Sequence, residues 1–138
     1  MKKELDEKLV EKYPEIFADR HGDKRETLMC WGFACGDGWY WLIDRLCSSL
    51  QWDTDMNGEP QVVAVQVKEK FGVLCFYVKT ATPEQHSMIR FAESLSAHIC
   101  EDCGTTENMG KTSGWLKNIC EDCAPKQKHP WKKNENDN

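Results

Sequence analysis

The pentapeptide Ile-Cys-Glu-Asp-Cys occurs twice in this chain, at residues 99–103 and 119–123. Each copy places two cysteines so that the backbone between them can curl around both sulfurs, and sixteen residues separate the two pairs. This is the spacing of a four-cysteine zinc site. The predicted ligands are Cys100, Cys103, Cys120 and Cys123. Because sulfur would fill all four positions, no place remains for an activated water, and we expect one structural Zn²⁺ ion per chain.

The segment around these cysteines is too short and too polar to build an apolar core of its own. Metal binding of about 10 kcal/mol or more can replace such a core. We therefore predict a zinc ribbon over residues 99–125. Trp115 is expected to pack on the knuckle, with a stacking platform as the alternative, and Lys111 and Lys117 are expected to offset the thiolate charge.

The compartment decides how the other cysteines are interpreted. Residues 1–17 carry acids and lysines where a secretory signal has an apolar core, and no apolar run approaches the length of a membrane span. We expect a protein of the cytoplasm with no membrane contact, where thiols stay reduced. Four cysteines lie outside the repeat, and we expect them to pack as small buried side chains rather than to form a second metal site. They are Cys30, Cys35, Cys47 and Cys75.

Three segments before the ribbon have helical patterns. Residues 2–13 form a one-sided helix that ends before Pro14. Asp37 is predicted to be the N-cap of a second helix, and Thr82, Pro83 and Gln85 form the capping box of a third. The second helix is expected to bury Trp39, Leu42, Ile43, Leu46 and Leu50. The third is expected to bury Met88, Phe91, Ala92, Leu95 and Ile99.

Between the last two helices, residues 61–80 contain two runs rich in Val, Phe and Tyr around Lys-Glu-Lys-Phe-Gly. These runs predict a β-hairpin in which both faces of the second strand are apolar and need cover. The fold class is therefore α+β, a small antiparallel sheet packed by helices with a C-terminal four-cysteine zinc ribbon. We predict a core domain over residues 1–98, the ribbon over 99–125, and a disordered tail over 126–138.

An aromatic stretch over residues 30–41 reads CWGFACGDGWYW. Trp39 belongs to the inner face of its helix, which Tyr40 and Trp41 cannot share. The stretch is either a lid over the sheet or a contact surface, since exposed aromatic and arginine side chains dominate binding sites. The preceding loop supplies two arginines. The predicted partner-binding residues are Arg20, Arg25, Trp31, Tyr40 and Trp41.

Charge and motifs restrict the function further. The net charge is -5, and residues 98–138 hold six Lys against seven Asp plus Glu, which disfavours duplex nucleic acid as a partner. The four histidines belong to no nucleophile or metalloprotease motif, and we do not predict an enzyme. The loop carboxylates of Asp19, Asp23 and Asp37 leave a hydrolase as a third functional hypothesis, ranked after the two binding functions given below.

Three segments, CWGFACGDGWYWLIDRLC, QVKEKFGVLCFYV and ICEDCG...GWLKNICEDCA, occur in this order. In them, and over residues 13–124, the chain resembles a family of small uncharacterised zinc-binding proteins encoded by tailed phages and prophages. The resemblance implies the cytoplasm of a bacterial host and a nonessential accessory role. It carries no activity over to individual residues.

The first functional hypothesis is a phage accessory protein that binds, and so sequesters or inhibits, a host component. That component would be a protein, for example one of anti-phage defence, or a small nucleotide-type signal. Association of the chain into a homo-oligomer is a further alternative. The alternative is a nucleic-acid-associated regulator that uses the zinc ribbon. Small size, a closed metal site and surplus aromatic residues favour the first.

Overall fold

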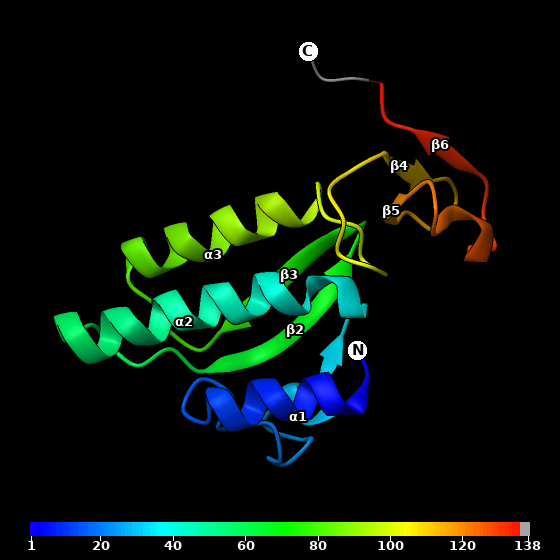
Figure 1. The fold of residues 1–138 in the computed structure, drawn as a ribbon. Coiled ribbons are helices and arrows are strands. Elements are labelled where there is room, and N and C mark those ends of the chain that lie inside the picture. The colour runs from blue at the N-terminus through cyan, green and yellow to red at the C-terminus, as the bar shows by residue number, and fades with distance from the viewer. Residues whose placement is uncertain (136–138) are drawn as a thin grey trace.

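Two small sheets organise the chain, and the computed structural model describes residues 1–135 (Figure 1). The helices are α1 (Lys3–Lys12), α2 (Tyr40–Asn57) and α3 (Pro83–Ser96). The strands are β1 (Phe33–Ala34), β2 (Ala64–Lys70), β3 (Val73–Val78), β4 (Met109–Thr112), β5 (Asn118–Cys120) and β6 (Trp131–Lys133). Among these residues, no helix has both the length and the apolar character that crossing a bilayer requires.

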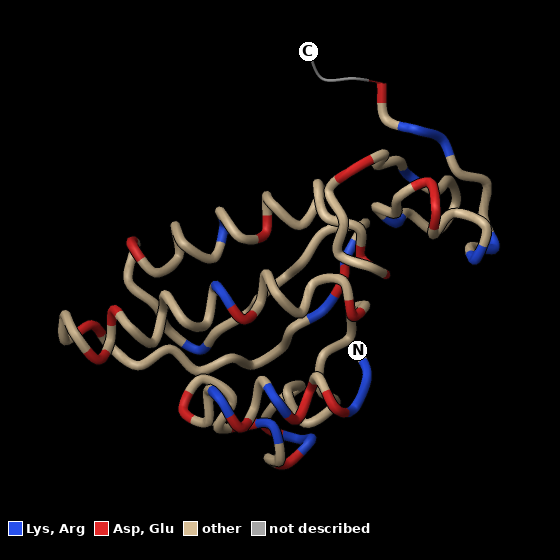
Figure 2. Tube along the Cα trace, viewed as in Figure 1, with Lys and Arg blue, Asp and Glu red and all other residues tan. Residues whose placement is uncertain are grey.

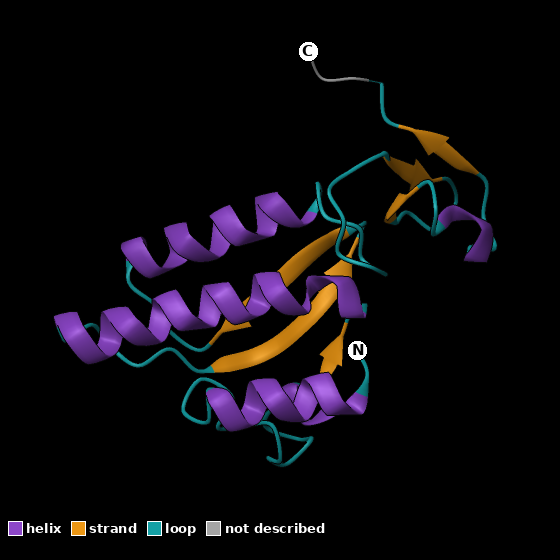
Figure 3. Ribbon diagram, in the orientation of Figure 1, coloured by secondary structure: helices purple, strands orange, loops and turns teal. Residues whose placement is uncertain are grey.

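The first sheet has the strand order β1-β2-β3. β2 and β3 form the predicted antiparallel hairpin, closed by a two-residue loop of Phe71 and Gly72, while β1 pairs with β2 in parallel. α2 and α3 lie side by side over one face of this sheet (Figures 1 and 3). The predicted α+β class is confirmed, with a mixed sheet in place of a purely antiparallel one.

α3 starts as the sequence indicates, and its inner stripe agrees with the predicted one at Met88, Ala92 and Ile99. The Thr82 hydroxyl accepts a hydrogen bond from the Gln85 main-chain N–H (3.1 Å), and the Gln85 side chain accepts one from the Thr82 N–H (2.9 Å). The predicted inner stripe is wrong at Phe91, which is 66% exposed, and at Leu95. The buried residues of α3 are Gln85, Ile89, Ala92 and Ser96.

α2 buries the predicted apolar residues, but Asp37 does not cap it. The helix begins at Tyr40 after a short 3₁₀ turn over Asp37–Trp39, and the Asp37 carboxylate accepts a hydrogen bond from the Lys2 main-chain N–H (2.7 Å). Gly38, in the middle of this turn, lies directly against the backbone of the first cysteine pair. Asp37 therefore attaches the start of the chain to the turn.

Both faces of β3 were expected to be covered, and only one is. Leu74 and Phe76 point into the main core and are almost completely buried. On the other side, Tyr77 is 42% exposed. This outer face of the sheet is bordered by the loop over residues 24–28.

The second sheet has the order β5-β4-β6 and forms the C-terminal module. The prediction of a disordered tail from residue 126 is wrong for the part described, because β6 pairs with β4. The Trp131 indole N–H donates to the Ile119 carbonyl (2.8 Å), and its ring lies where a side chain on Gly110 would be. Residues 136–138 of the predicted tail lie outside the described residues.

Candidate metal centre

The first cysteine pair lies in a tight turn directly after α3. The Cys100 main-chain N–H donates to the Thr105 carbonyl (2.8 Å), and the Gly104 N–H donates back to the Cys100 carbonyl (2.8 Å). Gly104 has a φ of +83°, a conformation that glycine adopts without strain. The turn presents the sulfurs of Cys100 and Cys103 on one side.

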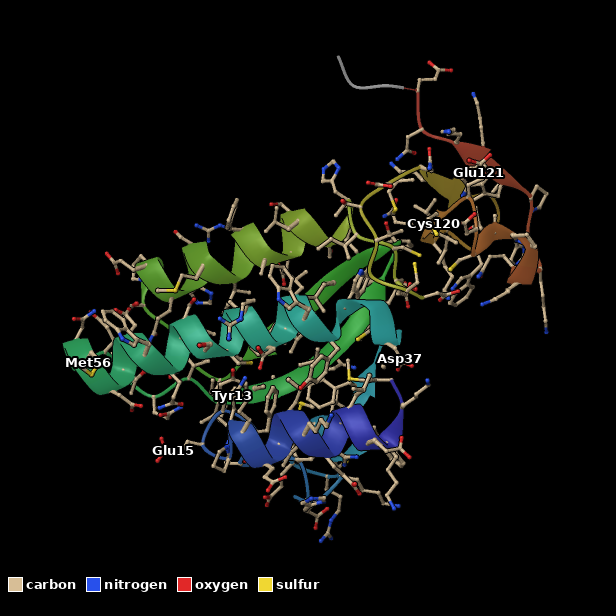
Figure 4. All side chains as sticks on the ribbon, viewed as in Figure 1. Tyr13, Glu15, Asp37, Met56, Cys120 and Glu121 are labelled. Carbon is tan, nitrogen blue, oxygen red and sulfur yellow. The ribbon has the colours of Figure 1, made fainter. Side chains whose placement is uncertain are left out.

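The second pair begins at the end of β5. The Cys123 N–H donates to the Cys120 carbonyl (3.2 Å), and a 3₁₀ turn over Ala124–Lys126 follows. Figure 4 shows Cys120 inside the C-terminal module, with Glu121 beside it. The β4–β5 pairing thus brings the second cysteine pair next to the first.

The four sulfurs of Cys100, Cys103, Cys120 and Cys123 lie within 4.8 Å of one another. The Cys103 and Cys120 sulfurs are 3.7 Å apart. A tetrahedral zinc site with bonds of about 2.3 Å requires sulfur separations of about 3.8 Å. The predicted ligands are therefore assembled in an arrangement that can hold a metal ion, with three of them buried and Cys103 exposed.

The surroundings of the cysteines shift their thiol pKa values in different directions. Burial opposes ionisation of the Cys100 thiol, but main-chain N–H groups of the two knuckles outweigh it and lower the pKa. Burial raises the pKa values of Cys103 and Cys123, and neighbouring thiols raise them further. Four sulfurs this close cannot all carry negative charge without a cation among them. The donor set therefore fits a bound divalent metal.

The knuckle is joined to the main domain through the glycines of the aromatic stretch. The Gly38 N–H donates to the Glu101 carbonyl (2.7 Å), the Gly36 N–H donates to the Glu101 carboxylate (3.1 Å), and the Trp39 indole N–H donates to the Ile99 carbonyl (3.0 Å). A Cβ atom on Gly36 or Gly38 would overlap carbonyl oxygens of the knuckle. The sequence pattern alone assigned no role to these glycines.

A second connection runs to the hairpin loop. The Asn118 side-chain amide donates to the Gly72 carbonyl (2.6 Å), and a Cβ on Gly72 would lie 2.9 Å from that nitrogen. The Glu101 Oε2 atom has no hydrogen-bond partner among residues 1–135 and lies 4.0 Å from the Lys117 ammonium. Burial raises the pKa of Glu101, and Lys117 opposes that shift. Lys117 therefore offsets the charge of the knuckle carboxylates, including that of Asp102.

The five predicted partner-binding residues do not form one surface. Arg20 is half-buried, and its guanidinium pairs with Asp6 (3.0 Å) and donates to the Cys30 carbonyl (2.9 Å). Arg20 and Trp31 line one hollow, and Arg25 lines another. Trp31 and Trp41 are 70% and 64% exposed, whereas Tyr40 packs against the main core.

The loop carboxylates are held apart by separate ion pairs. Asp19 pairs with Lys79 (2.8 Å), Asp23 with Arg25 (2.6 Å) and Asp37 with Lys2 (3.6 Å). Among residues 1–135, the four-cysteine cluster is the one group of side chains close enough to hold a metal. The three aspartates are thus not assembled into a site.

The remaining cysteines are placed as packing residues. Cys35 and Cys47 are buried, and Cys30 and Cys75 are half-buried. Burial raises the pKa of the Cys35 thiol to about 12 and raises that of Cys47 as well. Thiols with such pKa values stay protonated and unreactive at neutral pH.

Comparison of the chain with protein-family models, with curated proteins and with solved structures found no match.

Proposed function

We propose that the four-cysteine cluster is a closed structural zinc site and that residues 99–135 form a zinc ribbon extended by β6. Thiolates in this number and spacing select zinc over oxygen-preferring cations such as Mg²⁺ and Ca²⁺. The single observation that carries this proposal is the 3.7 Å separation of the Cys103 and Cys120 sulfurs. Zinc would supply positive charge and cross-linking, while this chain's knuckle N–H groups orient the sulfurs.

We propose further that the protein is a phage accessory protein of the bacterial cytoplasm that binds and sequesters or inhibits a host component. Exposed aromatic side chains support a binding role, because water is a poor solvent for them and they dominate binding hot spots. Trp31 and Trp41 are largely exposed. Their indole rings lie on the surface although the same stretch buries Trp39 completely.

The test is capture of the host component by tagged protein during infection. Trp31→Ala and Trp41→Ala should each weaken the affinity for the captured partner about thirtyfold and leave the melting temperature unchanged. Lys111→Ala serves as the control, because its side chain is exposed on β4. If Lys111→Ala protein no longer captured the partner while both tryptophan variants still did, the partner would be recognised by the ribbon instead.

A second candidate function, the nucleic-acid-associated regulator, is favoured by Trp115. This residue was expected to pack on the knuckle, and it is instead 66% exposed. Its ring lines a hollow together with Lys68, Lys70 and Phe71 of the hairpin. An exposed indole beside lysines is a suitable platform for a nucleobase next to a phosphate.

A further inference from the structure

The outer face of the first sheet carries a shallow hollow that no function above uses. Its volume is about 670 Å³. Gln66, Lys68 and Tyr77 line it from β2 and β3, and Lys24 and Arg25 line it from the neighbouring loop. Gln66 is opposite Tyr77 across the hairpin, so that an amide and a phenol ring share the floor. We call this the outer-face hollow.

A second hollow of about 240 Å³ lies at the end of the hairpin, between the hairpin and the ribbon. It shares Lys68 and Lys70 with the outer-face hollow, so that the two are continuous along β2. Phe71 and Trp115 are its aromatic residues, and they are 74% and 66% exposed. We call it the tip hollow.

Phe71 occupies a position where a phenylalanine is costly. Its φ is +52°, followed by +81° at Gly72, as a type I′ hairpin loop requires. Asn, Asp and Gly accept the first of these positions readily, whereas a bulky side chain adopts it rarely. Burial does not compensate for this strain, because the ring is mostly exposed. Such strain at an exposed site points to a functional constraint.

Trp115 is held in place by its own loop. The Thr112 hydroxyl donates to the Trp115 carbonyl (2.7 Å) and accepts a hydrogen bond from the Lys117 N–H (2.8 Å). The bond between Asn118 and Gly72 then fixes this loop next to the hairpin tip. Two aromatic rings are thus presented on a preorganised support, which reduces the entropy lost on binding.

The charges of this surface oppose the acidic net charge of the chain. Lys24, Lys68 and Lys70 have no carboxylate within 4.0 Å among residues 1–135. Glu26 and Glu69 also line the two hollows, and the Glu69 carboxylate accepts a bond from the Gly72 N–H (3.4 Å). Figure 2 shows basic and acidic segments interspersed along α1. Lysines without carboxylate partners can bind negative charges, and the aromatic rings between them can stack on flat rings. Together they can bind a polyanion that carries such rings.

We infer that the outer-face and tip hollows together bind single-stranded nucleic acid. The lysines would contact phosphates, and Phe71, Trp115 and Tyr77 would stack on bases. From Gln66 to Lys70 the strand covers about 13 Å, which matches about four steps between successive nucleotides stacked 3.4 Å apart. A surface of this length and openness favours a strand over a single nucleotide. The inference rests on the second candidate function, the nucleic-acid-associated regulator, and identifies the nucleic acid it binds as a single strand.

The first experiment measures fluorescence anisotropy of zinc-loaded, full-length protein with a labelled ten-nucleotide oligothymidylate. Binding should weaken with salt, with a slope of log K against log salt near -2, since each of three lysine–phosphate contacts contributes about -0.7. A duplex of the same length should bind more weakly. Thymidine monophosphate should compete only at far higher concentration than unlabelled oligonucleotide.

Variants test the residues. Lys68→Gln should reduce the magnitude of the salt slope by about 0.7, whereas Lys8→Gln, which removes an exposed charge from α1, should not. Trp115→Ala should weaken binding about tenfold or more, whereas Trp52→Ala, an exposed indole on α2, should not. Phe71→Asn is the sharpest variant: it should weaken binding about tenfold and raise the melting temperature, because Asn-Gly is a preferred type I′ loop.

Four outcomes would overturn the inference. They are no binding at low salt, equal or tighter binding of duplex, equal effects of Lys68→Gln and Lys8→Gln, and competition by the mononucleotide as strong as by the strand. In any of these cases, continued capture of a host component by Phe71→Asn protein would leave the proposed function standing. Loss of that capture in Trp31→Ala and Trp41→Ala concerns the proposed function alone.

Discussion

The main-chain N–H of Gly38 donates a hydrogen bond to the carbonyl oxygen of Glu101 across 2.7 Å, so that the aromatic stretch and the metal knuckle share one interface. Glu101 is 3% exposed and also accepts a hydrogen bond from Gly36 through its side chain. The ribbon is thereby attached to the main domain at the turn before α2. Its folding and that of the turn should be coupled.

Replacing Gly38 by Ala should lower the free energy of unfolding by about 2 kcal/mol or more. The new Cβ would overlap main-chain atoms of Cys100, Glu101 and Gly104, which cannot move without displacing the knuckle. Gly58→Ala is the control: its φ is +70°, with no atom within 4 Å of the new Cβ, so that its cost is about 1 kcal/mol of backbone strain. Urea unfolding gives the free energy of unfolding of both variants. An equal decrease in the two would contradict a tight interface at Gly38.

The purified protein should contain one zinc ion per chain by elemental analysis, and Cys120→Ser should bind it much more weakly. Hydrogen exchange should then show lost protection over residues 100–124 and at the Gly38 N–H, because that amide depends on the knuckle. α3 and the β2–β3 hairpin should keep their protection, because the main core has its own apolar contacts. Unfolding of the whole chain would show that the metal supports both modules.

Trp131→Ala should destabilise the C-terminal module by about 2 kcal/mol, through loss of the packing on Gly110 and of the hydrogen bond to Ile119. Trp52→Ala removes an indole of which 57% is exposed and should change stability by less than about 0.5 kcal/mol. Thermal melting of the zinc-loaded variants compares the two. Identical melting temperatures would mean that β6 contributes nothing to stability.

Local patterns predicted the parts of this fold that local chemistry controls. The capping box of α3, the hairpin and each of the two cysteine pairs depend on residues close together in the sequence. The buried face of α3 could not be predicted in this way. Gln85 donates to the Pro60 carbonyl (2.8 Å) and the Ser96 hydroxyl accepts from the Leu74 N–H (2.8 Å), so that polar residues face inward and Phe91 faces out.

The repeated pentapeptide shows the same limit within the candidate site. Its first glutamate, Glu101, is buried against the glycines of the aromatic stretch, whereas its second, Glu121, is exposed and pairs with Lys133 (3.5 Å). The same five residues therefore have different roles in the two copies. The repeat predicted that the four cysteines come together, and tertiary packing alone decided which copy faces the core.

Asp44 of α2 connects that helix to the end of α1. Its carboxylate accepts hydrogen bonds from the Lys12 ammonium (2.7 Å), the Tyr13 hydroxyl (2.9 Å) and the Arg45 guanidinium (3.1 Å). Burial opposes the ionisation of Asp44, but these donors outweigh it and hold its pKa below the ordinary value of 3.8. A depressed carboxyl pKa means that ionised Asp44 favours the folded state.

Asp44→Asn should therefore lower the free energy of unfolding by about 2 kcal/mol at pH 7, because hydrogen bonds to a charged group are replaced by weaker ones. The stabilisation by Asp44 is complete above pH 3.8 and is lost as pH falls through the lower folded-state pKa. The stabilities of Asp44→Asn and the unchanged protein should thus converge below that pH. Metal loss in acid affects both equally and cancels in the difference. Urea unfolding at pH 7, 5 and 3 measures this convergence, with the exposed Glu11→Gln as a control that should change little at any pH. A constant difference down to pH 3 would show that Asp44 acts through packing rather than charge.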